Sequence, residues 1–97
     1  MRMNETMTRQ EINEKLRAYL SESFLFDFND QITPNSNLFE AGLIDSFGFV
    51  QLVVFIEQEF GVEVSEDDLS SPEMASLEGI VTIVDRVRSS AATKIGT

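Results

Sequence analysis

The chain has 97 residues, of which 42 % are apolar, enough for one small domain with a single core. It has no Cys and no His, which excludes disulfides and thiolate chemistry and removes the commonest general base and metal ligand. Seven Lys and Arg against 17 Asp and Glu give a net charge of −10, which opposes nucleic-acid binding and favours steering toward basic protein surfaces. The composition therefore predicts a protein that is not an enzyme and holds no metal.

The two ends of the chain lack apolar runs. We expect residues 1–7 to be disordered and to contain no signal peptide, and we expect the small, polar tail 89–97 to be disordered as well. The longest apolar segment, residues 47–56, is shorter than the roughly 20 residues that cross a bilayer. These features predict a cytoplasmic protein, without membrane insertion, whose domain spans residues 8–88.

A capping-box pattern opens the first predicted helix. Thr8 and Glu11 stand ahead of apolar residues spaced i, i+4, i+7 and i+8, which predicts a helix from about Arg9 to Glu22. A long connection, residues 23–45, follows and contains both turn-forming and apolar residues. Loops of this length are uncommon in compact domains unless they are pinned or functional, so we expect this one to pack against the helices.

The second predicted helix has two apolar faces. Asp45 is its expected N-cap and Gly61 its C′ residue, which bound a helix over Ser46–Phe60. One face is a core stripe made by Phe49, Leu52, Val53, Ile56 and Phe60. The other face carries Phe47, Val50 and Val54, which either pack under the long loop or form a recognition strip for partner proteins. Phe55 lies on neither face.

Two further helices complete the pattern. A short one is expected after Ser65, over 66–69, and the following Ser-Ser-Pro breaks or restarts it. Ser76 caps the last helix, expected from Leu77 to about Arg88. No alternating run is long enough to predict a strand, so the fold class is all-α.

The most informative segment is residues 40–47, which read EAGLIDSF and place Asp45 and Ser46 after a Gly-Leu-Ile turn. Because the chain has no His or Cys to activate the Ser46 hydroxyl, we interpret this serine as a site that another enzyme modifies. The segment resembles the attachment signature of the acyl carrier protein family, in which Asp-Ser and an apolar residue follow a Gly-Leu/Met-apolar turn. The continuation VQL at 50–52 and EQEFG at 57–61 is also similar, and the resemblance covers roughly residues 9–88.

The resemblance implies an acyl-carrier-like four-helix bundle with a long loop between helices one and two and a short helix three. It also implies a 4′-phosphopantetheine arm on Ser46, added from coenzyme A by a phosphopantetheinyl transferase. Asp45 would support attachment by contributing oxygens to a Mg²⁺ that the transferase holds, and the helix N-terminus favours the phosphodiester anion. The thiol of the arm would hold acyl or aminoacyl thioesters in a protein that has no cysteine of its own.

Two positions differ from the fatty-acid carriers. Gly48 and Gln51 stand where those proteins usually have acidic residues, so the segment looks more like D-alanyl and other stand-alone aminoacyl carriers, which receive cargo from an adenylate-forming ligase. Gly48 costs a helix about 1 kcal/mol relative to Ala. We hypothesise that it permits close approach of a partner or of the arm.

The sequence therefore predicts a monomeric carrier that moves thioesters from an adenylate-forming acyl or aminoacyl ligase to an acyl-accepting synthase or transferase. The acidic residues around the short third helix are either a solvated face or a docking site. The alternatives are a small acidic helical adaptor without a prosthetic group and a carrier of fatty-acid synthesis. The residues that we expect to face partners are Phe47, Val50, Gln51, Val54, Glu57, Glu66 and Asp67.

Overall fold

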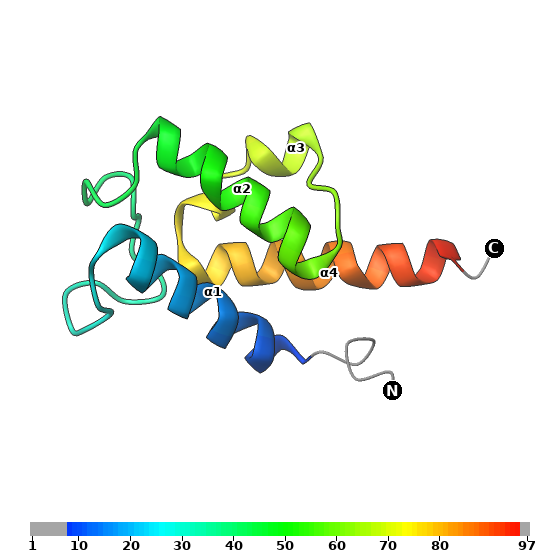
Figure 1. Ribbon diagram of the computed structural model, residues 1–97, viewed down its shortest axis with the longest axis horizontal. Coiled ribbons are helices and arrows are strands. Elements are labelled where there is room, and N and C mark those ends of the chain that lie inside the picture. Colours follow the sequence, from blue (N-terminus) through cyan, green and yellow to red (C-terminus); the bar gives the residue numbers. More distant parts are fainter. Residues whose placement is uncertain (1–7, 96–97) are drawn as a thin grey trace.

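The computed structural model describes the backbone of residues 8–95 and the side chains of residues 8–89, and this part of the chain is helical without strands. The elements in chain order are α1 (Arg9–Phe24), α2 (Ser46–Phe60), α3 (Glu66–Leu69), the 3₁₀ helix η2 (Pro72–Ala75) and α4 (Leu77–Ile95) (Figure 1). The predicted all-α bundle, with a long first loop and a short third helix, is confirmed. The disorder predicted for residues 1–7 falls outside the described residues.

Local capping explains where most helices begin and end. The capping box of α1 is formed by Thr8 and Glu11, and α2 has the predicted bounds, with Asp45 as N-cap and a left-handed Gly61 at its end. The predicted end of α4 near Arg88 is wrong, because α4 continues to Ile95, into the segment for which we predict disorder. The sequence beyond Arg88 contains no Pro or Gly before residue 96, so nothing local stops the helix there.

The core lies where α1, α2 and η2 pack on α4, which runs behind the other helices in Figure 1. Of the stripe predicted for α2, Phe49 and Val53 are only half-buried and lie at the edge of the core. Burial of apolar side chains is the main stabilising contribution in a domain of this size. The fully buried side chains are Ile12, Leu16, Leu20, Leu38, Leu52, Ile56, Met74, Leu77, Ile80, Val81, Ile83 and Val84.

Backbone hydrogen bonds pin the long loop to the end of η2 and the beginning of α4. The Leu38 N–H donates to the Ala75 carbonyl at 2.8 Å, and the Glu78 N–H donates to the Pro34 carbonyl at 2.8 Å. The Leu38 side chain is fully buried beneath this junction. The loop is therefore a packed part of the domain, as predicted, and it holds the segment that leads into α2.

Candidate functional site

Ser46 is the first residue of α2 and is exposed to solvent. Its position follows from Asp45, whose Oδ1 accepts a hydrogen bond from the Gly48 N–H at 2.8 Å and whose carbonyl accepts from the Phe49 N–H at 2.9 Å. The N–H groups of the first turn that have no partner within the helix point out of its N-terminal end, where they form the positive end of the helix dipole. The Ser46 hydroxyl thus stands on a rigid element, next to a site that favours an anion.

The loop that delivers Ser46 is a compact turn. Asn37 Oδ1 accepts hydrogen bonds from the N–H groups of Phe39 and Glu40, at 3.0 and 2.9 Å. Gly42 has a φ of 79°, a left-handed conformation that glycine adopts without steric cost. The Leu43 N–H then donates to the Leu38 carbonyl at 3.0 Å, and the buried Ile44 anchors the chain directly before α2. The Gly-Leu-Ile turn of the sequence motif therefore fixes where α2 begins.

Asp45 combines a structural contact with an accessible charge. One carboxylate oxygen is engaged in the N-cap, while the residue as a whole is exposed. A bidentate group of this kind can cap the helix and still offer an oxygen to an external cation. Among the described residues, no group of three or more acidic side chains is arranged to hold a metal ion by itself.

The second apolar face of α2 is open to solvent. Phe47 is 71 % exposed, Val50 59 % and Val54 46 %, so the alternative that these residues pack beneath the long loop is wrong. Gln51 is also exposed on this helix. We call Phe47, Val50 and Val54 the apolar strip. It extends along α2 from the residue next to Ser46.

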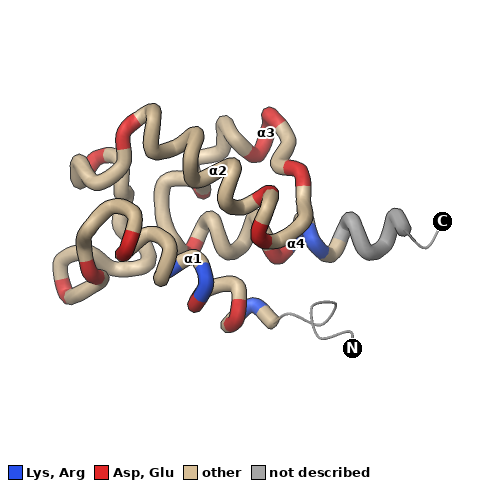
Figure 2. The backbone as a smooth tube through the Cα atoms, viewed as in Figure 1, with Lys and Arg blue, Asp and Glu red and all other residues tan. Residues whose placement is uncertain are grey.

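The acidic residues expected to face partners do not form one group. Glu66 and Asp67 are exposed in α3, which is well separated from the N-terminal end of α2 in Figure 2. Asp68 instead pairs with Arg86 of α4. Glu57 is half-buried, and its Oε2 accepts a hydrogen bond from the Val64 N–H at 3.2 Å. Glu57 therefore holds the connection between α2 and α3, and its role toward partners stays a prediction.

Sequence reasoning missed the reason for Gly48. A Cβ at this position would lie 2.5 Å from Cε1 of Phe24, the last residue of α1. The space that we assigned to a partner or to the arm is taken by a side chain of the same chain. Phe55 is explained in a similar way, because its ring stacks on Tyr19 with centroids 4.0 Å apart. Neither contact has a local signal in the sequence, since both join α1 to α2.

Comparison with known proteins connects this geometry to a family. A family model described as a phosphopantetheine attachment site matches residues 12–84. The chain belongs to the phosphopantetheine-binding carrier proteins. The carrier is 40 % identical over 62 residues to an acyl carrier protein of Lactobacillus johnsonii, an alignment that covers 64 % of this chain and 76 % of that protein.

Further relatives of the carrier include both acyl and D-alanyl carrier proteins. It is 32 % identical over 79 residues to the acyl carrier protein of Thermotoga maritima, covering 81 % of this chain and 94 % of that protein. It is 42 % identical over 48 residues to a D-alanyl carrier protein of Bacillus velezensis, covering 50 % and 62 %. The cofactor of the carrier is phosphopantetheine. An exposed hydroxyl at a capped helix N-terminus fits a phosphodiester-linked arm.

The described part of the carrier contains no helix that is both long and apolar enough to span a membrane.

Proposed function

We propose that the carrier bears its phosphopantetheine arm on Ser46 and shuttles acyl or aminoacyl thioesters from an activating ligase to an acceptor enzyme in the cytoplasm. The observation that carries this proposal is the exposed Ser46 hydroxyl at the capped beginning of α2, within the matched region. The chain performs no catalysis of its own, since it lacks the His and Cys that most such mechanisms use. The thiol that holds cargo belongs to the arm.

Attachment requires a phosphopantetheinyl transferase and coenzyme A. The Ser46 oxygen forms a new bond to the phosphorus that bears the pantetheine, the pyrophosphate bond of coenzyme A breaks, and the nucleotide leaves. The hydroxyl proton passes to a base on the transferase. Asp45 supports the step by offering its exposed carboxylate to the Mg²⁺ that the transferase holds with the phosphates.

The apolar strip is the proposed docking face for partner enzymes. No charged residue occurs in α2 between Ser46 and Ile56, and Figure 2 shows the body of α2 without charge between acidic segments at its ends. Lys15 pairs with Glu59 of α2 and Arg9 with Glu78 of α4, so each of these cations already has an acidic partner within the chain. The partner that fits has an apolar surface flanked by basic residues. The net charge of −10 disfavours a second copy of this chain.

The charge of α2 favours an aminoacyl cargo over a fatty acyl cargo. Gly48 and Gln51 leave the upper part of α2 without negative charge, whereas the relatives include both acyl and D-alanyl carrier proteins and fit either cargo. The activating partner would then be an adenylate-forming ligase that is specific for an amino acid. Thioester formation with purified aminoacyl and fatty acyl ligases compares the two cargo classes directly.

A loading assay tests the proposal. The chain is incubated with coenzyme A, Mg²⁺ and a promiscuous phosphopantetheinyl transferase, and its intact mass is measured. We expect the wild type and the control Ser23→Ala, which alters another exposed serine, to gain the arm. Ser46→Ala should keep the fold and gain nothing. Loading of the Ser46→Ala variant would contradict the site, and a wild type that is never loaded would favour the adaptor alternative.

A further inference from the structure

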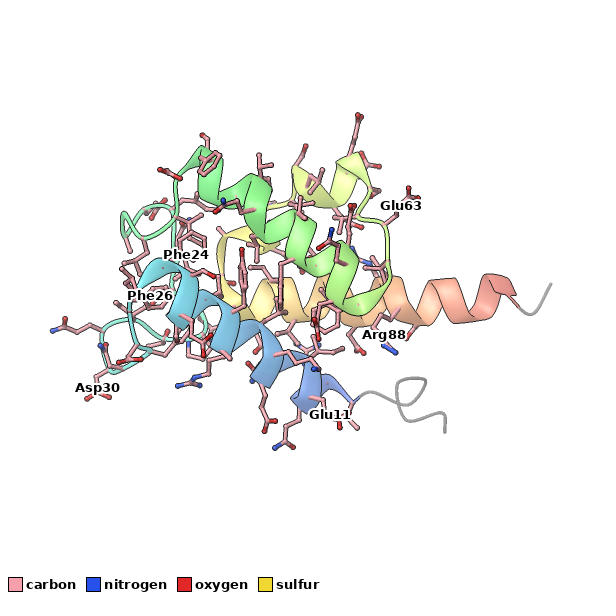
Figure 3. The ribbon with its side chains drawn as sticks, in the orientation of Figure 1. Glu11, Phe24, Phe26, Asp30, Glu63 and Arg88 are labelled. Atoms are coloured by element: carbon pink, nitrogen blue, oxygen red, sulfur yellow. The ribbon has the colours of Figure 1, made fainter. Side chains whose placement is uncertain are left out.

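The end of α1 touches the first turn of α2, close behind Ser46. The ring of Phe24 lies against Gly48, where an added Cβ would be 2.5 Å from Cε1 and 3.1 Å from Cζ. Figure 3 labels Phe24 between the end of α1 and the beginning of α2. The Gly48 N–H is the same group that Asp45 caps. Gly48 therefore contacts both the Phe24 ring at the end of α1 and the Asp45 carboxylate that caps α2 before Ser46.

Phe24 is itself held by other rings. It meets Tyr19 edge-on, with centroids 6.2 Å apart and planes at 84°. Tyr19 stacks on Phe55, which in turn meets Phe60 edge-on at 6.1 Å. Aromatic contacts of this geometry are favourable beyond the area that they bury. The row of rings runs from the first turn of α2 to its last residue and fixes α2 against α1.

The backbone directly after Phe24 is strained. Leu25 has a φ of 60° and a side chain that is 88 % exposed. A left-handed conformation is unfavourable for a residue with a Cβ, and an exposed leucine gains nothing from burial. The turn at Leu25, closed by a hydrogen bond from the Phe26 N–H to the Ser21 carbonyl at 3.2 Å, ends α1 directly after Phe24. The chain thus accepts strain next to the residue that contacts Gly48.

We infer that Phe24 is a positioning residue for arm attachment: its ring, seated against Gly48, fixes the first turn of α2 so that the Ser46 hydroxyl is presented to the transferase. This inference rests on the proposed function, because it assumes that Ser46 is the modified residue. Small displacements of a reacting group lower the rate of a positioned reaction steeply. Gly48 is then required by the contact with Phe24, and not by a partner.

Three variants test the contact. Phe24→Leu removes the ring, Gly48→Ala pushes against it, and the double variant gives the new methyl group the space that the ring has left. We expect each single variant to lower kcat/KM for loading by about tenfold or more, at a temperature where circular dichroism shows a folded chain. The double variant should recover part of this loss. Phe26→Leu is the matched control, because Phe26 is also half-buried but packs on Phe28, with centroids 5.1 Å apart.

Amide hydrogen exchange provides a readout that does not depend on loading. Exchange of the Gly48 N–H should become about tenfold faster or more in Phe24→Leu, relative to amides in the middle of α4, and stay unchanged in the control. Wild-type loading together with wild-type Gly48 exchange in a folded Phe24→Leu variant would overturn the inference. If Phe24→Leu does not fold, wild-type loading of Gly48→Ala together with wild-type exchange of its Phe49 N–H, which donates to the Asp45 carbonyl, would overturn it. Failure of the wild type to load contradicts the proposed function instead, and the exchange data still decide whether Phe24 fixes the turn.

Discussion

At the scale of single residues, Asp45 has two separable properties, a hydrogen bond and a charge. Its Oδ1 caps α2 through the Gly48 N–H, and its exposed carboxylate is free to approach a cation that a transferase brings. Asn caps helices about as well as Asp but carries no charge. Substitution by Asn therefore separates the structural contribution of Asp45 from its contribution to attachment.

We expect Asp45→Asn to change the free energy of unfolding by less than about 0.5 kcal/mol, because the cap remains. Loading by the transferase should fall by about tenfold or more, because the ligand to Mg²⁺ is lost. Asp45→Ala should lose about 1 kcal/mol of stability as well. Urea denaturation and the initial rate of loading measure the two effects. Wild-type loading of the Asn variant would show that the charge has no part in attachment.

Leu25 is the second residue whose properties can be separated. Its left-handed backbone is strained, and its side chain is almost fully exposed. Leu25→Gly should raise the free energy of unfolding by about 1 kcal/mol, because glycine adopts a φ of this sign without the steric penalty. Urea denaturation measures the change. A loss of stability would mean that the leucine side chain makes contacts that outweigh the backbone strain.

At the scale of elements, helix limits follow from local signals, whereas the crossings between elements do not. The Asp45 cap and Gly61 predict α2 to the residue, and Thr8 and Glu11 predict the beginning of α1. The same residues carry no information about what lies against Gly48, because Phe24 is remote in sequence. The end of α4 was also missed, since helix propensity continues after the core pattern has stopped.

Gly79 marks a crossing that the sequence does not reveal. A Cβ on Gly79 would overlap the backbone of Glu73 in η2, including its carbonyl oxygen, so only glycine fits where η2 crosses the first turns of α4. Gly79→Ala should lower the free energy of unfolding by about 1–3 kcal/mol, because backbone atoms must move. Gly61→Ala is a useful comparison, because its cost comes from a φ of 64° in open space. A Gly79→Ala variant as stable as the wild type would contradict the close crossing.

At the scale of the whole molecule, charge and apolar surface are distributed unevenly. The side chains of Arg9, Lys15 and Arg86 form ion pairs within the chain, while the apolar strip on α2 stays open. The sequence predicts the three residues of the strip from their spacing, and the structure shows that the loop leaves them uncovered. The sequence does not predict that the Glu57 carboxylate accepts a hydrogen bond from the Val64 N–H. Domain limits at residues 8 and 88 and a monomeric state remain predictions.

The strip predicts how partner enzymes respond to mutation and to salt. Phe47→Ser should weaken binding to the loading ligase by about 1–3 kcal/mol, because the residue lies next to Ser46 and its side chain is the most exposed of the strip. Glu66→Gln should act mainly on the association rate and on its dependence on ionic strength. Surface plasmon resonance at several salt concentrations separates the two effects. Equal affinity of Phe47→Ser and wild type would place the docking face elsewhere.

The central claim, that Ser46 carries a phosphopantetheine arm, is tested most directly by the intact mass of the protein purified from its native host. Masses are compared before and after thioester cleavage, and the modified peptide is sequenced. We predict a phosphopantetheine adduct on Ser46, with a further loss of mass on cleavage that identifies the cargo. A chain that is unmodified in the host, and that also resists a promiscuous transferase in vitro, would contradict the claim.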